Sequence, residues 1–287
     1  MIKHAVQIGA ITVLALASMF YPFMPGTYDR MAVPLSGMAQ VLGVVGLVLV
    51  PIGMVWLFYE LANRRRMSGP VPFKARSYWF AVCALAATLI VCAAVALASM
   101  QAGLSLTIGV LMLTAYAVRR AAPAMKRLKS GGHIGFNPTP LYLIIIPGIL
   151  ATAHFAFLKT AVEISRNRTI VGSTPFINAI EAYRTAHGRY PQSLESMHHD
   201  YDPPTVGVAR YRYEPHGQSY NVFFEQPTWP IGTQEFVMYN PRDEHVMIVH
   251  NQDLLESTQE EVDRERNFHA RAARDAGVRH WKYFWFD

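Results

Sequence analysis

The densest group of potential metal ligands in this chain is the run of five residues from His198 to Asp202. It contains two histidines, a tyrosine and two aspartates, so imidazole and carboxylate groups are both present. Calcium prefers several oxygen ligands, which the two histidines do not supply. Adjacent residues also need distant partners before they can surround one ion. We therefore interpret the run as a solvated loop and expect no metal site there.

The other ionisable residues give no clearer sign of chemistry. His245 and His250 are five residues apart on a predicted strand, and side chains at that spacing face opposite sides of a sheet. The charge run from Glu260 to Arg266 is typical of a solvated helix. The sequence has no nucleophile elbow, phosphate-binding glycine loop or zinc-type ligand spacing. We expect no enzyme activity, no catalytic residue and no cofactor.

Five long apolar runs occupy the first half of the chain, and the part after residue 162 is water-soluble in character. Each run has 16 to 22 residues, against about 20 needed to cross a bilayer as a helix. We expect Pro51 and Gly53 to kink the second run. The predicted organisation is a transmembrane anchor over residues 1–157 and a soluble domain over residues 158–287. The runs are Ala5 to Tyr21, Val41 to Leu61, Trp79 to Met100, Gly103 to Val118 and Leu141 to Phe157.

The charges of the two halves differ in sign. Residues 1–162 carry 13 Lys and Arg against two acidic residues, Asp29 and Glu60, whereas residues 163–287 carry 13 against 18. The basic residues of the first half gather in two loops, at residues 64–76 and 119–129. The positive-inside rule places both loops in the cytoplasm, so the N-terminus is predicted inside and the C-terminal domain outside. The soluble half has no basic stripe with interleaved aromatics, so we expect no nucleic-acid partner.

The N-terminus allows two interpretations. Lys3, the first apolar run and Ala15-Leu16-Ala17 resemble a signal peptide with a small-residue cleavage site. The alternative is an uncleaved first span, and the orientation of the later spans is the same in both cases.

Polar residues are scarce within the spans. No Asp, Glu, Lys or Arg lies deep inside one, and Glu60 is at a cytoplasmic end. Ion-coupled transporters usually need such groups, so transport is a poor interpretation. For His154, near the outer end of the fifth run, we expect a hydrogen-bonded packing role in preference to a proton relay.

The third run is rich in alanine and contains both cysteines of the chain, Cys83 and Cys92. Nine residues along a helix turn through about 900° and about 13 Å, so the two thiols lie on opposite faces and cannot pair. Small side chains permit close helix contact in lipid. We expect these alanines to pack within the chain's own bundle, the alternative being contact with another protein.

The soluble half begins with helices. The fifth apolar helix is predicted to continue from Leu158 to Gly172. A second helix follows from Pro175 to Ala186, with Ser173 as a hydroxyl cap and an apolar face of Phe176, Ile177, Ile180 and Tyr183. Gly188 is predicted to end it in the left-handed conformation. Residues 191–197 are predicted to form a further short helical turn.

Strand signals follow the helices. Two hairpins are predicted, one from Ala209 to Tyr213 with Ser219 to Glu225, and one from Gln234 to Asn240 with His245 to His250. Leu254 to Ala276 is charged and predicts a third, exposed helix. The fold class expected is therefore a five-span α-helical transmembrane bundle plus an extracytoplasmic α+β domain, whose antiparallel sheet packs on one long helix.

The last seven residues contain five aromatics. They are Trp281, Tyr283, Phe284, Trp285 and Phe286. Three interpretations are open. The aromatics are core for the small domain, a belt lying at the membrane interface, or a segment that docks a partner.

One part of the soluble half resembles a known class. The pattern runs through Ala179-Ile180-Glu181-Ala182-Tyr183, His187-Gly188-Arg189-Tyr190-Pro191 and Leu194-Glu195. It resembles the pilin-like class, the major pseudopilins of type II secretion and the type IV pilins, and Tyr211-x-Tyr213 with Ser219-Tyr220 is similar too. The resemblance implies a membrane helix that continues into a globular head with an antiparallel sheet. It also implies that Tyr183 and Tyr190 anchor the loop leaving the helix and that Pro191 fixes its exit.

The chain departs from that class at its processing site. Gly135-Phe136 follows basic residues, but Pro140 occupies the position of the conserved pilin glutamate and four spans precede it. We therefore do not expect processing and polymerisation as a pilin. The sequence therefore predicts a bacterial inner-membrane protein with a periplasmic pilin-like domain. Its predicted function is that of a non-catalytic binding or assembly component of an envelope machine. Membrane lipid and other envelope, secretion or pilus proteins are its expected partners. A membrane sensor or ligand-binding protein is the alternative.

Overall fold

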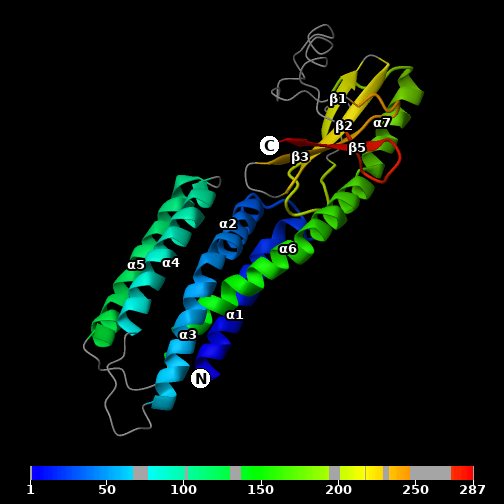
Figure 1. Ribbon diagram of the computed structural model, residues 1–287. Coiled ribbons are helices and arrows are strands. Elements are labelled where there is room, and N and C mark those ends of the chain that lie inside the picture. Colours follow the sequence, from blue (N-terminus) through cyan, green and yellow to red (C-terminus); the bar gives the residue numbers. More distant parts are fainter. Residues whose placement is uncertain are drawn as a thin grey trace. The chain divides into compact units, whose positions relative to one another are not determined.

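The computed structural model describes residues 2–66, 77–100, 103–129, 137–193, 201–216, 218–228, 233–245 and 273–286 (Figure 1). The chain divides into two compact units, described separately below. The helical unit consists of Met1–Tyr21 and Met31–Lys159, and the sheet unit consists of Pro22–Arg30 and Thr160–Asp287.

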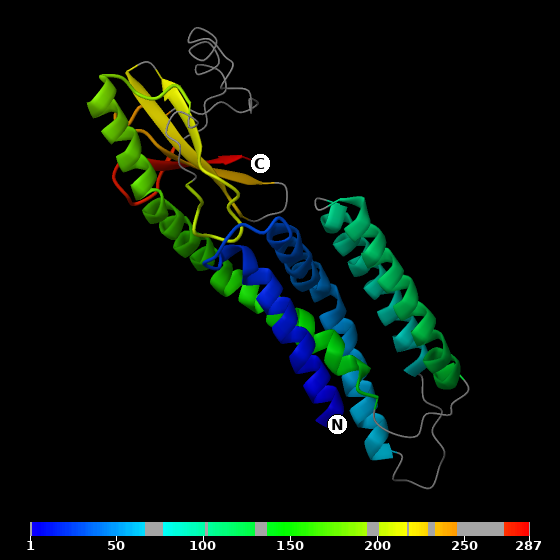
Figure 2. The same cartoon turned by 180° about the vertical axis from the view of Figure 1, so that it is seen from behind.

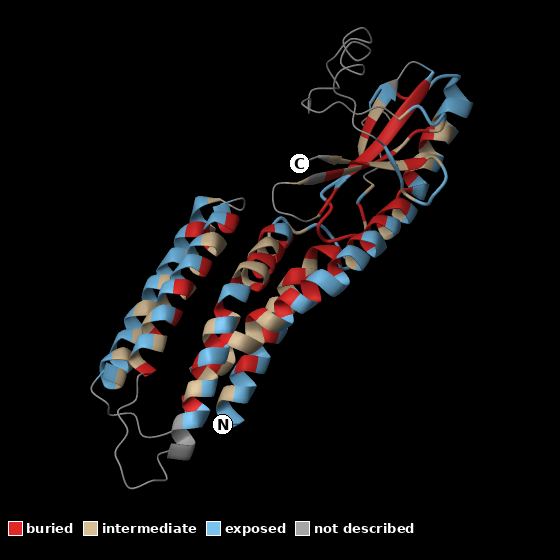
Figure 3. Ribbon diagram, viewed as in Figure 1, coloured by how far each residue is buried: buried red, intermediate tan, exposed pale blue. Residues whose placement is uncertain are grey.

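Among the described residues, five helical segments are long and apolar enough to cross a membrane, as predicted. They are Ile2–Phe23, Ala32–Ala62, Ser77–Ser99, Leu104–Lys129 and Thr139–His187. Many of their apolar residues are exposed, and Figure 3 shows much of the length of these helices in pale blue, the colour of exposed residues. The elements are α1 (Ile2–Phe20), η1 (Tyr21–Phe23), α2 (Ala32–Val44), η2 (Val45–Val48), α3 (Leu49–Arg66), α4 (Ser77–Ser99), α5 (Leu104–Lys129) and α6 (Thr139–Gly172).

The second span begins at Ala32, nine residues before the predicted start at Val41. Polar residues interrupt the apolar run, but their side chains bond inside the bundle. The Ser36 hydroxyl donates to the Met19 carbonyl, and the Gln40 amide donates to the Ser36 oxygen at 2.9 Å. The helix changes to a 3₁₀ turn at Val45–Val48, just before Pro51. Proline has no N–H for the Leu47 carbonyl, which accounts for the break in regular α-helical bonding at this turn.

Glycines let the second span approach α6 closely. A Cβ added to Gly43 or Gly46 would lie 2.9 Å from Leu150 Cβ or Pro147 Cβ. At Gly53 it would lie 2.8 Å from Ile144 Cγ1 and 3.0 Å from Leu143 Cβ. Such contacts are tighter than real Cβ atoms adopt, so the two helices depend on glycine at these positions.

Gly53→Val is therefore expected to destabilise the helical unit by about 1–3 kcal/mol, because the added side chain overpacks the contact with α6. Thermal unfolding of the full-length protein in detergent micelles would measure the loss. Gly109→Val in α5 is the matched control, since nothing lies within 4 Å of a Cβ there. Equal losses in the two variants would contradict a close contact at Gly53.

The alanines of α4 pack within this chain, as predicted. Ala81, Ala84 and Ala87 are buried in one cluster with Leu49 and Trp56 of α3. Phe80 stacks near Trp56, with ring centroids 6.3 Å apart. The small side chains thus bring α4 close to α3.

The predicted antiparallel sheet packed against helices is present in the sheet unit. Its strands are β1 (Arg212–His216), β2 (Ser219–Gln226), β3 (Gln234–Tyr239), β4 (Arg274–Asp275) and β5 (Trp281–Phe286), in the order β1-β2-β3-β5-β4. The end of α6 and helix α7 (Thr174–His187) cover one face of this sheet, as Figure 2 shows from behind. Ile170 of α6 and Phe176 and Ile180 of α7 meet the buried side chains of the strands there.

Both predicted helices of this unit are present, with one correction. Helix α6 continues to Gly172, and α7 ends at Gly188, which has φ +69° in the left-handed region. The predicted hydroxyl cap at Ser173 is wrong. Its backbone is helical, and its hydroxyl donates back to the Ile170 carbonyl at 2.7 Å.

The strands differ from the prediction in three places. The first begins at Arg212, three residues later than Ala209. Strand β3 pairs with β2 on one side and with β5 on the other, so its predicted partner is replaced by the C-terminal strand. Residues 246–250 of that predicted partner lie outside the described residues. So does most of the predicted helix from Leu254, whose last residues, Arg274–Asp275, form β4.

The aromatic C-terminus is core, one of its three predicted interpretations. Strand β5 places Trp281 in the cluster shared with the helices. Phe284, on the other face, joins a second cluster with Phe223 and Met238. Side chains of alternate residues in this strand therefore pack on opposite faces of the sheet.

The loop between α1 and α2 belongs to the sheet unit. Pro25 forms an isolated antiparallel bridge with Thr205. Backbone N–H groups donate across this pairing from Val206 to Met24 (3.1 Å) and from Gly207 to Pro22 (2.9 Å). The Arg168 side chain of α6 also donates to the Phe23 carbonyl at 2.8 Å. A loop from the N-terminal part of the chain thus joins residues of the C-terminal domain.

Candidate functional site

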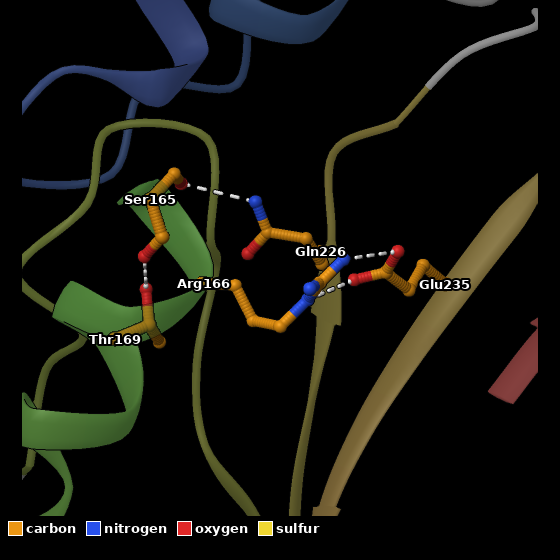
Figure 4. Close-up of polar contacts among 5 residues, drawn as sticks. All are labelled: Ser165, Arg166, Thr169, Gln226 and Glu235. Atoms are coloured by element: carbon orange, nitrogen blue, oxygen red, sulfur yellow. Dashed lines mark hydrogen bonds and ion pairs between the residues drawn. The ribbon is translucent and has the colours of Figure 1, made fainter. Parts of the chain in front are cut away.

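A buried polar network joins α6 to the sheet, and we call it the polar clamp. It consists of Ser165, Arg166 and Thr169 of α6, Gln226 of β2 and Glu235 of β3 (Figure 4). The three helix residues lie within two turns, so one stretch of α6 presents all of them to the sheet. Residues of α6 thus meet residues of two strands that lie 61 and 69 positions later in the chain.

An ion pair lies at the centre of the polar clamp. Arg166 Nε donates to Glu235 Oε1 at 2.7 Å, and Nη2 donates to Oε2 at 2.9 Å. The guanidinium also lies over the ring of Tyr283, 4.2 Å from its centroid. The Glu235 side chain is fully buried. Both carboxylate oxygens are therefore occupied by a bidentate partner, which is the strongest common geometry for such a pair.

Burial and the neighbouring arginine shift the pKa of Glu235 in opposite directions. Burial raises the pKa of its carboxyl above the usual value, whereas the hydrogen bonds and charge of Arg166 lower it. Removing the arginine would take away the largest influence that lowers this pKa, leaving burial opposed only by the charge of Arg274. A buried carboxylate without a partner is costly, so each member of the pair requires the other.

Hydroxyl and amide groups extend the polar clamp. The Gln226 amide donates to the Ser165 hydroxyl at 3.0 Å, and the Thr169 hydroxyl donates to the Ser165 carbonyl. The Thr169 hydroxyl also lies 2.9 Å from that of Thr205, and Tyr211 donates to the Thr169 carbonyl at 2.6 Å. Most of these groups bond to one another, although Gln226 Oε1 is buried without a hydrogen-bond partner. The network is better suited to holding α6 against the sheet than to exchanging protons with a substrate.

A second polar group, the tyrosine cluster, surrounds Glu181 of α7. It consists of Tyr190, Tyr213, Tyr220 and Tyr239. The Tyr220 hydroxyl donates to Glu181 Oε1 at 2.8 Å, and its ring lies 4.8 Å from that of Tyr190. Tyr213 donates to the Pro191 carbonyl at 2.7 Å. Of the two predicted anchors, Tyr190 packs against Tyr220, whereas Tyr183 stacks on His187 of its own helix. The residue that bonds to Pro191 is Tyr213, which was not predicted.

Alkaline pH is expected to destabilise the sheet unit. Burial raises the pKa of Tyr211, Tyr213 and Tyr220 above the usual value of 10.0, and the bond to Glu181 raises that of Tyr220 further. Unfolded phenols lose protons from about pH 10, while the folded ones keep theirs. The folded state then binds more protons, so stability falls with pH, by about 1.4 kcal/mol per pH unit for each tyrosine.

Urea unfolding of the full-length protein in detergent, repeated at increasing pH, would measure this slope. Tyr220→Phe removes one titrating group. It is therefore expected to reduce the slope of unfolding free energy against pH by about 1.4 kcal/mol per pH unit. A slope that Tyr220→Phe leaves unchanged would show that this phenol does not couple folding to pH.

The residues singled out as possible ligands do not converge in the described part of the chain. His198, His199 and Asp200 lie outside it, as does His250. Tyr201 stacks on Phe176, with centroids 4.9 Å apart, and Asp202 is exposed. No group of three His, Cys, Asp or Glu suited to a metal occurs among the described residues.

Other histidines and Glu60 also have structural contacts. His245 Nε2 lies 2.9 Å from the His280 carbonyl, and His280 Nδ1 lies 3.0 Å from Asp243. His154 is buried and packs edge-on to Phe155. Glu60 is also buried, accepting from Trp56 Nε1 at 3.0 Å and Ser77 Oγ at 2.7 Å. Its carboxylate therefore joins α3 to α4.

Sequence reasoning did not predict the polar clamp. Arg166 and Glu235 are 69 residues apart, and neither stands in a recognisable motif. The available signal was local: Arg166 follows the apolar part of α6 in a helix predicted to pack on the sheet. Comparison with known proteins adds no assignment, because no family model, curated protein or solved structure matches this chain significantly.

Proposed function

We propose that this protein is a non-catalytic binding or assembly component of a bacterial envelope machine. In this proposal the five apolar helices span the inner membrane, and the sheet unit is a periplasmic, pilin-like head that contacts partner proteins. The observation that carries the proposal is the continuity of α6. Its residues Thr139–Lys159 belong to the helical unit, and Thr160–Gly172 continue into the sheet unit.

The polar clamp supports this function. It ties the continuing part of α6 to β2 and β3 through the Arg166–Glu235 pair and the Gln226–Ser165 bond. A helix that continues from an apolar segment into the side of an antiparallel sheet is the arrangement that the pilin-like resemblance implies. Such a helix is suited to presenting a folded head at a membrane.

The proposed orientation rests on charge. Arg119, Arg120, Lys126, Arg127 and Lys129 are in the second half of α5, and the other basic group follows Leu61. Basic residues at helix ends are retained on the cytoplasmic side. The loop of Pro22–Arg30 joins the sheet unit, which is compatible with both lying on the opposite, periplasmic side.

Chemical crosslinking in intact cells would test the proposed function. The tagged full-length protein would be crosslinked, extracted in mild detergent and identified with its partners by mass spectrometry. Recovery of pilus or secretion components is the expected result, and the Trp281→Ala variant, which removes a core side chain of the head, should lose them. Recovery of the protein alone would contradict the assembly function.

A membrane sensor is the second candidate function, favoured by one observation. The loop of Pro22–Arg30 connects α1 to α2 and pairs through its backbone with residues 204–207. A ligand that altered that pairing would act directly on the connection between two apolar helices. Ligand-induced protection of this loop from hydrogen exchange, without protein partners, would favour the sensor over the assembly component.

A further inference from the structure

A cavity of about 880 Å³ lies within the helical unit, beside the basic half of α5. Its volume is within the range of small-molecule sites. Trp56 of α3, Leu85 of α4 and Leu143 of α6 line it together with residues of α5. Four helices of one unit therefore contribute to its wall.

The wall of the cavity has a basic and an apolar part. Arg119, Arg120 and Arg127 of α5 supply three positive charges, and none of the described residues that line the cavity is acidic. The nearby carboxylate of Glu60 is buried and bonded to Trp56 and Ser77. The remaining wall is largely apolar, with Ala81, Ala84, Leu85, Leu128 and Leu143. This combination complements an anion that carries a hydrocarbon chain.

One of the arginines is held in place by its neighbour. Arg120 Nε donates to the Tyr116 hydroxyl at 2.9 Å, and both residues line the cavity. Pro123, which also lines it, lies inside α5. Because proline has no N–H, the Arg119 carbonyl lacks its usual helical partner at that turn.

The depth of the arginines matches a lipid headgroup. Helix α5 begins at Leu104, so Arg119 lies about 22 Å and Arg127 about 35 Å along its axis at 1.5 Å per residue. The hydrocarbon core of a bilayer is about 30 Å thick. With α5 crossing the membrane, the arginines bracket the level where acyl chains end and phosphates begin. Basic pockets between membrane helices bind such headgroups.

We propose that this cavity binds an anionic phospholipid, with the phosphate at Arg119, Arg120 and Arg127 and an acyl chain along the apolar wall of α4. This proposal is independent of any protein partner of the head. The arginines recognise the phosphate by charge-assisted hydrogen bonds. The apolar wall distinguishes a lipid from free phosphate.

Native mass spectrometry of the full-length protein in detergent would test the site. It would be titrated with phosphatidylglycerol, with phosphatidylcholine of identical acyl chains, and with inorganic phosphate as competitor. Phosphatidylglycerol is expected to bind about tenfold more tightly than phosphatidylcholine, equivalent to about 1.4 kcal/mol. The triple variant Arg119→Gln, Arg120→Gln, Arg127→Gln should remove that preference.

Two further variants distinguish a defined binding site from non-specific attraction between the basic helix and an anionic lipid. Lys126→Gln removes a charge from the same helix at a position that does not line the cavity, and it should retain the preference. Ala124→Trp fills the cavity from an exposed lining position and should weaken phosphatidylglycerol binding with every charge intact. Equal binding of the two lipids, an equal loss in Lys126→Gln and the triple variant, or unchanged binding in Ala124→Trp would each overturn the proposal. Displacement of the lipid by inorganic phosphate would assign the site to the free ion instead.

Discussion

Replacing Glu235 with alanine is expected to lower the free energy of unfolding of the sheet unit by about 3–5 kcal/mol. The substitution leaves the Arg166 guanidinium buried without its bidentate partner, and an uncompensated buried charge has a cost of this size. Urea unfolding of the full-length protein in detergent, detected by pulse proteolysis, would measure the change. Glu244→Ala is the matched control, because Glu244 is exposed and such surface changes stay within about 0.5 kcal/mol.

The double variant Arg166→Met, Glu235→Leu distinguishes two causes of the lost stability. One is the loss of the ion pair itself, and the other is the cost of leaving one buried charge without a partner. Apolar replacements of a buried ion pair are often nearly neutral, so the double variant should recover most of the stability lost by Glu235→Ala. A double variant no more stable than Glu235→Ala would show that the pair itself, and not the stranded charge, accounts for the loss.

Trp281→Ala is expected to destabilise the same unit by about 3–5 kcal/mol, the usual cost of removing a buried aromatic side chain. Trp281 is 4% exposed, and its ring centroid lies 5.5 Å from that of Tyr239 and 6.0 Å from that of Phe224. The same unfolding measurement applies. Trp285→Ala, in the same strand at a half-buried position, is the control and should cost less. Equal losses would contradict the assignment of Trp281 to the core.

The features predicted correctly from the sequence are those with a local cause. The five apolar helices follow from runs of apolar residues as long as a bilayer is thick. The end of α7 at Gly188 follows from the ease with which glycine adopts the left-handed conformation. The start of the second span was misplaced because Ser36 and Gln40 look like loop residues until their bonding partners are known.

The features that were missed depend on contacts between distant residues. Nothing near β3 in the sequence indicates that its second neighbour is β5, because aromatic residues at a C-terminus fit several roles. The pairing of Pro25 with Thr205 and the bond between Arg166 and Glu235 have the same origin. Each residue is ordinary in its local context and acquires its role only when the chain folds.

Site-specific photocrosslinking in intact cells tests the central claim, that the head contacts a partner protein, most directly. A photoreactive residue would replace Ala182 or Thr185, which are exposed on α7, and Leu113, which is exposed on α5, as the membrane control. Protein adducts of one defined mass from the α7 positions, without the same adducts from Leu113, are the predicted result. Adducts shared equally by all three positions, or none from α7, would contradict the claim.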